Sequence, residues 1–277
     1  MTDSDCIGSP EIEEQIKRVL RDTDKVDLPL VSNVLQESRD RWYGQLAVSA
    51  YDSLSEHEDD EDILPVAAAI ELLRESVRLR SRLFVTLTNE HPHSLTLEPT
   101  AALLTGDYLY TAAFSSLRSV PDARSGDCFE ILTAVHETIT GRFARTYTPA
   151  KSGESDKAVF LDETVGSLGE GAAVLGGTLA GLDQPNHRHF ERLGGELSVA
   201  RQSRLILEAD PGEATVVPPT IDQAQLRALA KRRQEHANRA LDALSATVDV
   251  TRLREFAEAT TGVQDGAGSV TGDDVLD

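Results

Sequence analysis

The residues best placed to do chemistry in this 277-residue sequence are five arginines on two predicted helices. The set is Arg74, Arg78, Arg82, Arg201 and Arg204. The first three stand four residues apart, so a helix places them in one stripe. A guanidinium can grip a phosphate through two parallel hydrogen bonds, which predicts a metal-free anion site. The alternative is salt bridges on solvated faces with neighbours such as Glu71, Glu75 and Glu208, and the sequence leaves both interpretations open.

The elements that must position these arginines are helices. Apolar residues recur at helical spacing along most of the chain, and no run of alternating strands interrupts them. Proline-containing segments separate the helices. The expected ranges are roughly 28–51, 63–88, 97–118, 123–147, 156–182, 187–209, 220–246 and 249–260. The sequence therefore predicts an all-α, multi-helix bundle.

One domain is expected over residues 1–261. Residues 262–277 consist mainly of Gly, Ser, Thr, Asp and other small residues, so we expect a disordered acidic tail. Residues 166–181 contain six glycines, although each costs a helix interior about 1 kcal/mol relative to alanine. Such a stretch indicates either close approach of two helix backbones or a break in the helix.

The charge balance excludes two classes of partner. The formal net charge is −20 and the sequence pI is about 4.7, whereas nucleic acids and anionic membranes both require a basic surface. By direct count 22 of the 27 basic residues are arginine and five are lysine. An acidic, lysine-poor surface suits concentrated salt, where screening removes self-repulsion. We therefore expect a haloarchaeal protein; the alternative is an ordinary acidic cytosolic one.

No segment predicts export or membrane insertion. The chain starts with an acidic stretch that lacks the features of a signal peptide, and its uncharged runs are too short for a bilayer. Cys6 and Cys128 are far apart and lack ligand spacing, so neither a disulfide framework nor structural zinc is expected. These observations predict a cytoplasmic protein that needs no cofactor.

Three stretches resemble a known family when taken in order. They are residues 67–73 (AAAIELL), residues 103–109 (LLTGDYL, followed by Ala113 and Phe114), and residues 176–181 (GGTLAG, followed by Leu193, Gly194 and Gln202). Their order and spacing are similar to those of the trans-isoprenyl diphosphate synthases, also called the polyprenyl synthetase family, over about residues 28–246. The resemblance implies the family's helical bundle around a central cavity.

In that family two DDxxD motifs face each other and hold Mg²⁺ on a substrate diphosphate. Carried over position by position, the first motif falls on Ser81, Arg82 and Val85, and the second on Leu205, Ile206 and Ala209. The basic residues that grip the substrate diphosphates are also missing. Removing one electrostatic stabiliser typically costs about 10²–10³ in rate, so the resemblance implies a degenerate member without metal or catalytic residues.

The resemblance also implies where a prenyl chain would lie. The residues one turn before the first motif limit product length in the family, and here they are Ser76 and Val77. Both are small, which leaves a tunnel open if the arginines do not fill it. Arg78 and Arg82 would then lie at its mouth.

Three functions remain open from the sequence. The first is a catalytically deficient partner or regulatory subunit, in a homo- or hetero-oligomer with an active prenyl synthase. The second is a non-catalytic binding module for a prenyl chain or a prenyl diphosphate, held by the five arginines with Ser76 and Val77. The third is a diverged prenyltransferase with altered chemistry.

Overall fold

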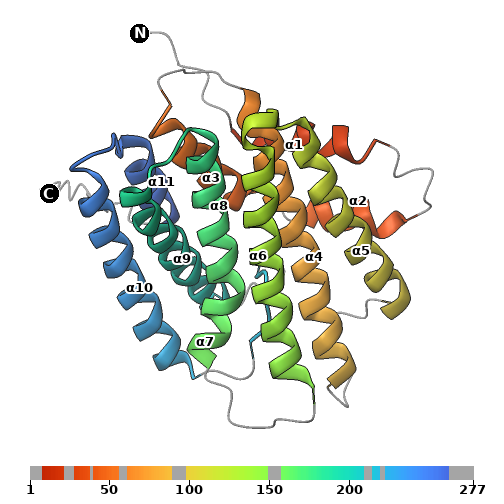
Figure 1. The fold of residues 1–277 in the computed structure, drawn as a ribbon. Coiled ribbons are helices and arrows are strands. Elements are labelled where there is room, and N and C mark those ends of the chain that lie inside the picture. Colours follow the sequence, from red (N-terminus) through yellow and green to blue (C-terminus); the bar gives the residue numbers. More distant parts are fainter. Residues whose placement is uncertain are drawn as a thin grey trace, which may run out of the picture.

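Long helices lying side by side form the body of the molecule in the computed structural model (Figure 1). The structure describes residues 8–21, 28–37, 40–55, 61–88, 98–148, 157–208, 214–218 and 222–261. The helices are α1 (Ser9–Val19), α2 (Pro29–Glu37), α3 (Trp42–Asp52), α4 (Leu64–Thr88), α5 (Pro99–Ser116), α6 (Asp122–Tyr147), α7 (Lys157–Leu161), α8 (Ser167–Leu179), α9 (Gln184–Leu207), α10 (Gln223–Leu244) and α11 (Thr251–Thr261). The described residues contain no strand, which confirms the all-α prediction.

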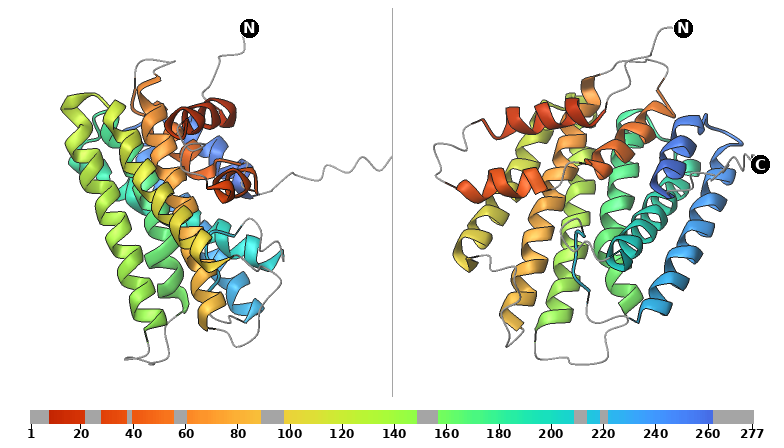
Figure 2. Two further views of the ribbon diagram at one scale, coloured as in Figure 1. Left: turned by 90° about the vertical axis from the view of Figure 1, so that its right-hand side faces the viewer. Right: turned by 180° about the vertical axis from the view of Figure 1, so that it is seen from behind.

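Helix α4 lies at the centre of this arrangement. It packs against α1, α3, α5, α6 and α8, and nearly all of its first five turns are buried. Helices α1 and α2 cross the long helices on the back of the molecule, as the right-hand view of Figure 2 shows. A helix enclosed on every side can be apolar all round, yet α4 carries charged residues in its buried stretch. Those residues form the candidate site described below.

The helix boundaries differ from the prediction at two places. The expected helix over residues 28–51 is divided into α2 and α3, and Arg41 before α3 takes a left-handed conformation with φ 44°. The expected helix over 156–182 contains a π-helical turn, Asp162–Gly166, between α7 and α8. Helix α1 was not predicted at all. The predicted tail, residues 262–277, lies outside the described residues.

The glycine-rich stretch brings two helix backbones together. A Cβ added to Gly169 on α8 would lie 2.2 Å from the carbonyl oxygen of Gly194 on α9, and one added to Gly194 would lie 2.1 Å from that of Gly169. A Cβ on Gly176 would lie 2.0 Å from the carbonyl oxygen of Ala47 on α3. Close approach, one of the two explanations that the sequence left open, therefore accounts for these glycines.

None of the helices in the described ranges combines the length and apolar content needed to cross a bilayer.

Candidate functional site

The arginine stripe of α4 points into the protein interior. Arg74 and Arg78 are fully buried, and Arg82 is 6% exposed. Glu71 and Glu75, on the same helix, are also fully buried. The expected pairing with glutamates is therefore present, but its expected place on a solvated face is wrong. Burial of this many charges is costly unless each is paired and hydrogen-bonded.

Carboxylates from α4 and from the α2–α3 region surround these guanidinium groups. Arg74 Nη1 lies 3.3 Å from Glu75 Oε1 and 3.6 Å from Glu71 Oε2. Arg78 Nε donates to Glu75 Oε2 at 2.7 Å, and its Nη2 donates to the Val34 carbonyl oxygen at 2.7 Å. Glutamate and arginine spaced three residues apart thus pair within one buried helix.

Two residues outside α4 complete the charge balance. Glu37 at the end of α2 accepts a 3.1 Å hydrogen bond from Arg82 Nη1 and lies 3.4 Å from Arg78 Nη2. Asp40 lies 3.7 Å from Arg74 Nη1 and also pairs with Arg201 of α9. Four guanidinium groups therefore meet four carboxylates. This central arginine cluster consists of Arg74, Arg78, Arg82, Arg201, Glu37, Asp40, Glu71 and Glu75.

The pKa shifts follow from burial and from this pairing. Burial opposes the charge of Arg74, but the carboxylates of Glu75, Glu71 and Asp40 outweigh it and raise its pKa. Burial also raises the pKa of Glu71, although Arg74 and Arg41 oppose that shift and the Gly44 amide donates to Glu71 at 2.8 Å. The same burial lowers the pKa of Arg78, with Glu75 opposing it.

An extended segment of the chain, residues 214–217, runs between α4 and α9 at the level of the cluster (Figure 2, right). We call it the strap. Its Thr215 Oγ1 accepts from Arg74 Nε at 3.1 Å, and its Val217 amide donates to Ser81 Oγ at 2.9 Å. On the other side, Gln202 accepts from the Thr215 amide at 3.1 Å and donates to the Val216 carbonyl oxygen at 3.0 Å.

The strap lies between α4 and α9, the two helices that the resemblance expects to face each other across a cavity. In the resemblance, Ser81 stands at a carboxylate position of the first motif, and Gln202 lies three residues before the first carboxylate position of the second. Both bind the strap instead of facing a ligand. Ala214, Thr215 and Val216 are at most 4% exposed, so the strap forms part of the core. The protein's own backbone thus supplies the polar groups that link α4 to α9.

These residues do not fit the magnesium ions that the fold family implies. Magnesium prefers carboxylate and phosphate oxygens in open coordination positions. Ser81, Arg82 and Val85 offer no carboxylate, and Glu75 and Glu71, about two and three turns before Ser81, are engaged by guanidinium groups. Across the described ranges, no group of three or more His, Cys, Asp or Glu side chains could hold a metal ion.

The remaining predicted site residues separate into two environments. Ser76 is 1% exposed and donates to the Gly106 carbonyl oxygen at 2.8 Å, and Val77 lies in the hydrophobic core. Arg201 stacks over Trp42 at 5.5 Å from the ring centroid. Arg204 lies further along α9 and lines two surface grooves, away from the α4 stripe.

The clefts lined by described residues include four that bear on the predicted site. They are a groove of about 950 Å³ between α9, α10 and α11, one of about 480 Å³ at the ends of α1, α4 and α5, one of about 410 Å³ between α3, α9 and α11, and one of about 180 Å³ between α6, α8 and α9. Arg74, Ser76, Val77, Arg78 and Arg82 line none of these four. The structure therefore does not bring the five arginines together around one of them.

Several residues of the centre were missed by sequence reasoning. Glu37 and Asp40 flank the break between α2 and α3, so their spacing from α4 carries no helical signal. Thr215 lies in a proline-flanked break, where no periodic pattern marks it as buried. Gln202 differs from these residues, because the resemblance to the family had already singled it out in the sequence.

The comparisons with known proteins agree with this architecture. No protein-family profile matches the sequence, and no curated protein does. Solved structures match it well. A geranyl diphosphate synthase small subunit from Antirrhinum majus has a TM-score of 0.67 and 16% identity, covering 91% of this chain and 97% of that one. A geranyltranstransferase from Methanosarcina mazei has a TM-score of 0.69 and 15% identity, covering 91% and 94%.

A third match is a deletion mutant of heterotetrameric geranyl pyrophosphate synthase from mint. Its TM-score is 0.63 at 15% identity, covering 91% of this chain and 98% of that one. Identities this low establish a shared fold. The chain has the all-α fold of the trans-isoprenyl diphosphate synthases over nine-tenths of its length.

Proposed function

We propose that the protein is a catalytically deficient subunit that pairs with an active prenyl synthase. The observation that supports this proposal is the central arginine cluster, whose guanidinium groups pair with carboxylates, together with the strap, which binds Ser81 and Arg74 on the helix that carries the first motif in the resemblance. A chain that has the fold over nine-tenths of its length, and whose described residues offer no cluster of metal ligands, is suited to packing rather than to metal-dependent chemistry. Two of the matching structures support this reading by their descriptions, one a small subunit and one a heterotetrameric synthase.

Activity of the chain alone is the first test. We expect no chain elongation above a blank when the purified protein is given Mg²⁺, isopentenyl diphosphate and an allylic diphosphate. Restoring three carboxylates through Ser81→Asp, Arg82→Asp and Val85→Asp should not rescue activity, because the second metal site stays absent. Turnover by the unaltered chain would show that the protein is a diverged prenyltransferase instead.

Association is the second test. Coexpression with a complete prenyl synthase from the same genome should yield a mixed oligomer of defined mass by light scattering, and should change the product chain length of that synthase. Purification from native extract, with identification of bound proteins and lipids, provides the partner. A chain that stays apart from every such synthase, and leaves its products unchanged, contradicts the proposal. Mg²⁺-independent binding of a prenyl diphosphate by the chain alone would favour a binding module.

The composition supports a salt-rich cytoplasm as the setting of this function. With a formal net charge of −20 and only five lysines, we infer that the protein is halophilic. Both tests should therefore be carried out in molar salt as well as in dilute buffer.

A further inference from the structure

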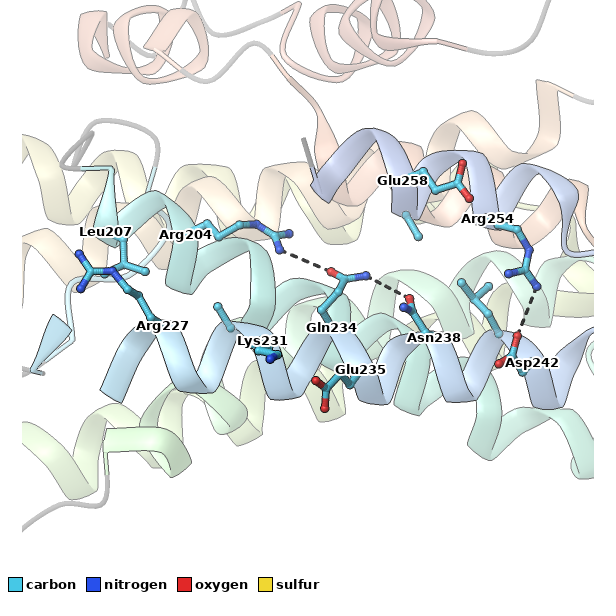
Figure 3. Close-up of a pocket in the computed structure, with 13 residues that line it drawn as sticks. Arg204, Leu207, Arg227, Lys231, Gln234, Glu235, Asn238, Asp242, Arg254 and Glu258 are labelled. Carbon is cyan, nitrogen blue, oxygen red and sulfur yellow. Dashed lines mark hydrogen bonds and ion pairs between the residues drawn. The ribbon is translucent and has the colours of Figure 1, made fainter. Parts of the chain in front are cut away.

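The largest of the four clefts described above lies on the outer face of the molecule, between α9, α10 and α11 (Figure 3). Its volume is about 950 Å³, and its floor is apolar: Leu207, Ala230, Leu241 and Ala257. Polar residues of α10 line one wall at helical spacing, from Arg227 to Asp242. We call this cleft the outer groove. It is separate from the central arginine cluster and plays no part in the function proposed above.

The two ends of the outer groove differ in charge. At one end Arg254 and Asp242 form a pair at 3.5 Å. The other end carries three cations, which are Arg204 of α9 with Arg227 and Lys231 of α10. Arg227 donates to the side-chain oxygen of Gln223 at 3.3 Å, and Arg204 to the carbonyl oxygen of Thr260 at 3.2 Å. Both acceptors are neutral, so these two hydrogen bonds do not themselves neutralise the guanidinium charges.

Other groups near Arg204 also favour binding of an anion at this end of the outer groove. Burial is the main cause that lowers its pKa, and the nearby Arg201 adds to it, whereas Glu208 opposes the shift. A partly desolvated guanidinium beside other cations gains most from an approaching carboxylate. Two acidic residues also line the outer groove: Glu235, one turn after Lys231 on α10, and Glu258 of α11. In a chain with 47 acidic and 27 basic residues, an end lined by three cations is unusual.

The chain itself supplies an anionic segment at this end. Helix α11 ends at Thr261, next to the Thr260 carbonyl that Arg204 binds, so residues 262–277 start beside the cations. Those sixteen residues contain four aspartates, an apolar pair at Val275 and Leu276, and no Lys, Arg or His. Fully extended they span about 50 Å, whereas the wall from Arg227 to Asp242 is about 22 Å long. The segment can therefore reach the whole outer groove.

We propose that residues 262–277 dock in the outer groove, with their aspartates on Arg204, Arg227 and Lys231. Covalent attachment gives the segment an effective concentration that a separate acidic peptide must exceed to compete. Contacts between exposed charges weaken in salt, because the screening length falls from about 10 Å at 0.1 M to about 3 Å at 1 M. Docking is therefore tightest in dilute buffer and loosens as salt is added.

A distance measurement between two spin labels on the full chain tests this proposal. The labels are attached to cysteines introduced by Ala228→Cys, on exposed α10 surface, and Thr271→Cys. Cys6→Ser removes one native thiol, and Cys128 is buried with a pKa raised to about 11, so it reacts slowly. In 0.1 M salt we expect a narrow population of short distances that broadens at 1 M.

Charge reversal identifies the contact. The double variant Arg227→Glu and Lys231→Glu should lower the short-distance fraction at least about fivefold. Adding Asp273→Lys and Asp274→Lys should restore much of it. The matched control reverses two exposed arginines of α9 outside the outer groove, Arg188→Glu and Arg192→Glu, and should change little.

Two results would overturn the proposal. One is a broad distance distribution that neither salt nor charge reversal changes, which leaves the outer groove to a separate acidic segment or a small anion. The other is a short-distance population that survives the reversal of Arg227 and Lys231, since the segment would then dock elsewhere. Neither result bears on the partner-subunit function, which is tested by association and activity.

Discussion

Arginines lie at two depths in this protein, and the two groups behave differently. In the central arginine cluster Arg74 and Arg78 are fully buried, and every guanidinium meets carboxylates from α4 or from the α2–α3 region. In the outer groove Arg204 and Arg227 contact neutral oxygens instead. Helix α9 contributes to both, since Arg201 pairs with Asp40 and Arg204 faces the outer groove. The comparison teaches that similar arginines serve stability where they are enclosed and remain available for binding where they are not.

We expect the largest change in the free energy of unfolding from a substitution in the central arginine cluster. Arg74→Met should lower the free energy of unfolding by about 3–5 kcal/mol, because it leaves Glu71 and Glu75 buried without their shared cation. Chemical denaturation in urea measures this loss. Adding Glu75→Gln should recover part of it, since one uncompensated charge disappears. A loss below about 1 kcal/mol would mean that water reaches the centre.

A substitution in the strap, which contacts the central arginine cluster, should lower the free energy of unfolding by a smaller amount. Thr215→Val keeps the shape of the side chain but removes the acceptor for Arg74 Nε, so we expect a loss of about 1–3 kcal/mol. The same change at the exposed Thr133 of α6 serves as the control and should cost well under 1 kcal/mol. Equal losses at the two positions would show that the strap contact contributes nothing specific.

Glu170 is neither enclosed like the central arginine cluster nor free like the outer groove. Its protonation makes the free energy of unfolding depend on pH. Part of the residue is exposed, but its carboxylate packs against Gly195 of α9. Burial, and then the charges of Glu191, Asp162 and Glu196, raise its pKa from 4.5 to about 7, with Arg233 opposing. The folded state therefore binds this proton more tightly than the unfolded state, and stability falls as pH rises from about 4.5 to 7.

Glu170→Gln should remove that pH dependence. After allowance for solvent screening, we expect the variant to be about 1 kcal/mol more stable than the wild type at pH 8 and nearly equal to it at pH 4. Unfolding free energies measured over this range provide the test. Glu137→Gln, at an exposed position of α6, is the control. An unchanged slope in the Glu170 variant contradicts the assigned cause.

We expect the smallest change in the free energy of unfolding from a substitution in the outer groove. Arg227→Met removes an exposed cation whose side chain donates only to Gln223, so the free energy of unfolding should change by no more than about 0.5 kcal/mol. Differential scanning calorimetry would detect a larger change. A loss comparable with that of Arg74→Met would erase the distinction between the two groups.

Sequence reasoning predicted the helices well where apolar periodicity was long. The predicted helix 63–88 coincides with α4, and that over 123–147 with α6. It failed where a single backbone feature decides the outcome, as at Arg41, whose left-handed φ separates α2 from α3. Periodicity reports which face of a helix is apolar, but it does not report the backbone conformation of a residue such as Arg41 at a helix boundary.

The candidate site was predicted less completely, for a physical reason. The partners of Arg74 include Glu71 and Glu75, which helical spacing reveals, and Asp40 and Thr215, which only tertiary contact reveals. Charged residues in a helix pattern normally indicate a solvated face. The buried α4 stripe is paired partly by carboxylates from distant segments, which helical spacing does not reveal, so the sequence alone did not show that the stripe is buried.

The strap has a consequence for how this protein responds to small molecules. A protein with an open centre gains stability from whatever fills it, by an amount that grows with the logarithm of ligand concentration. Here residues 214–217 of the chain itself bridge α4 and α9, in fixed stoichiometry and with no dissociation step. The stability that these contacts provide should accordingly be independent of the concentration of any ligand.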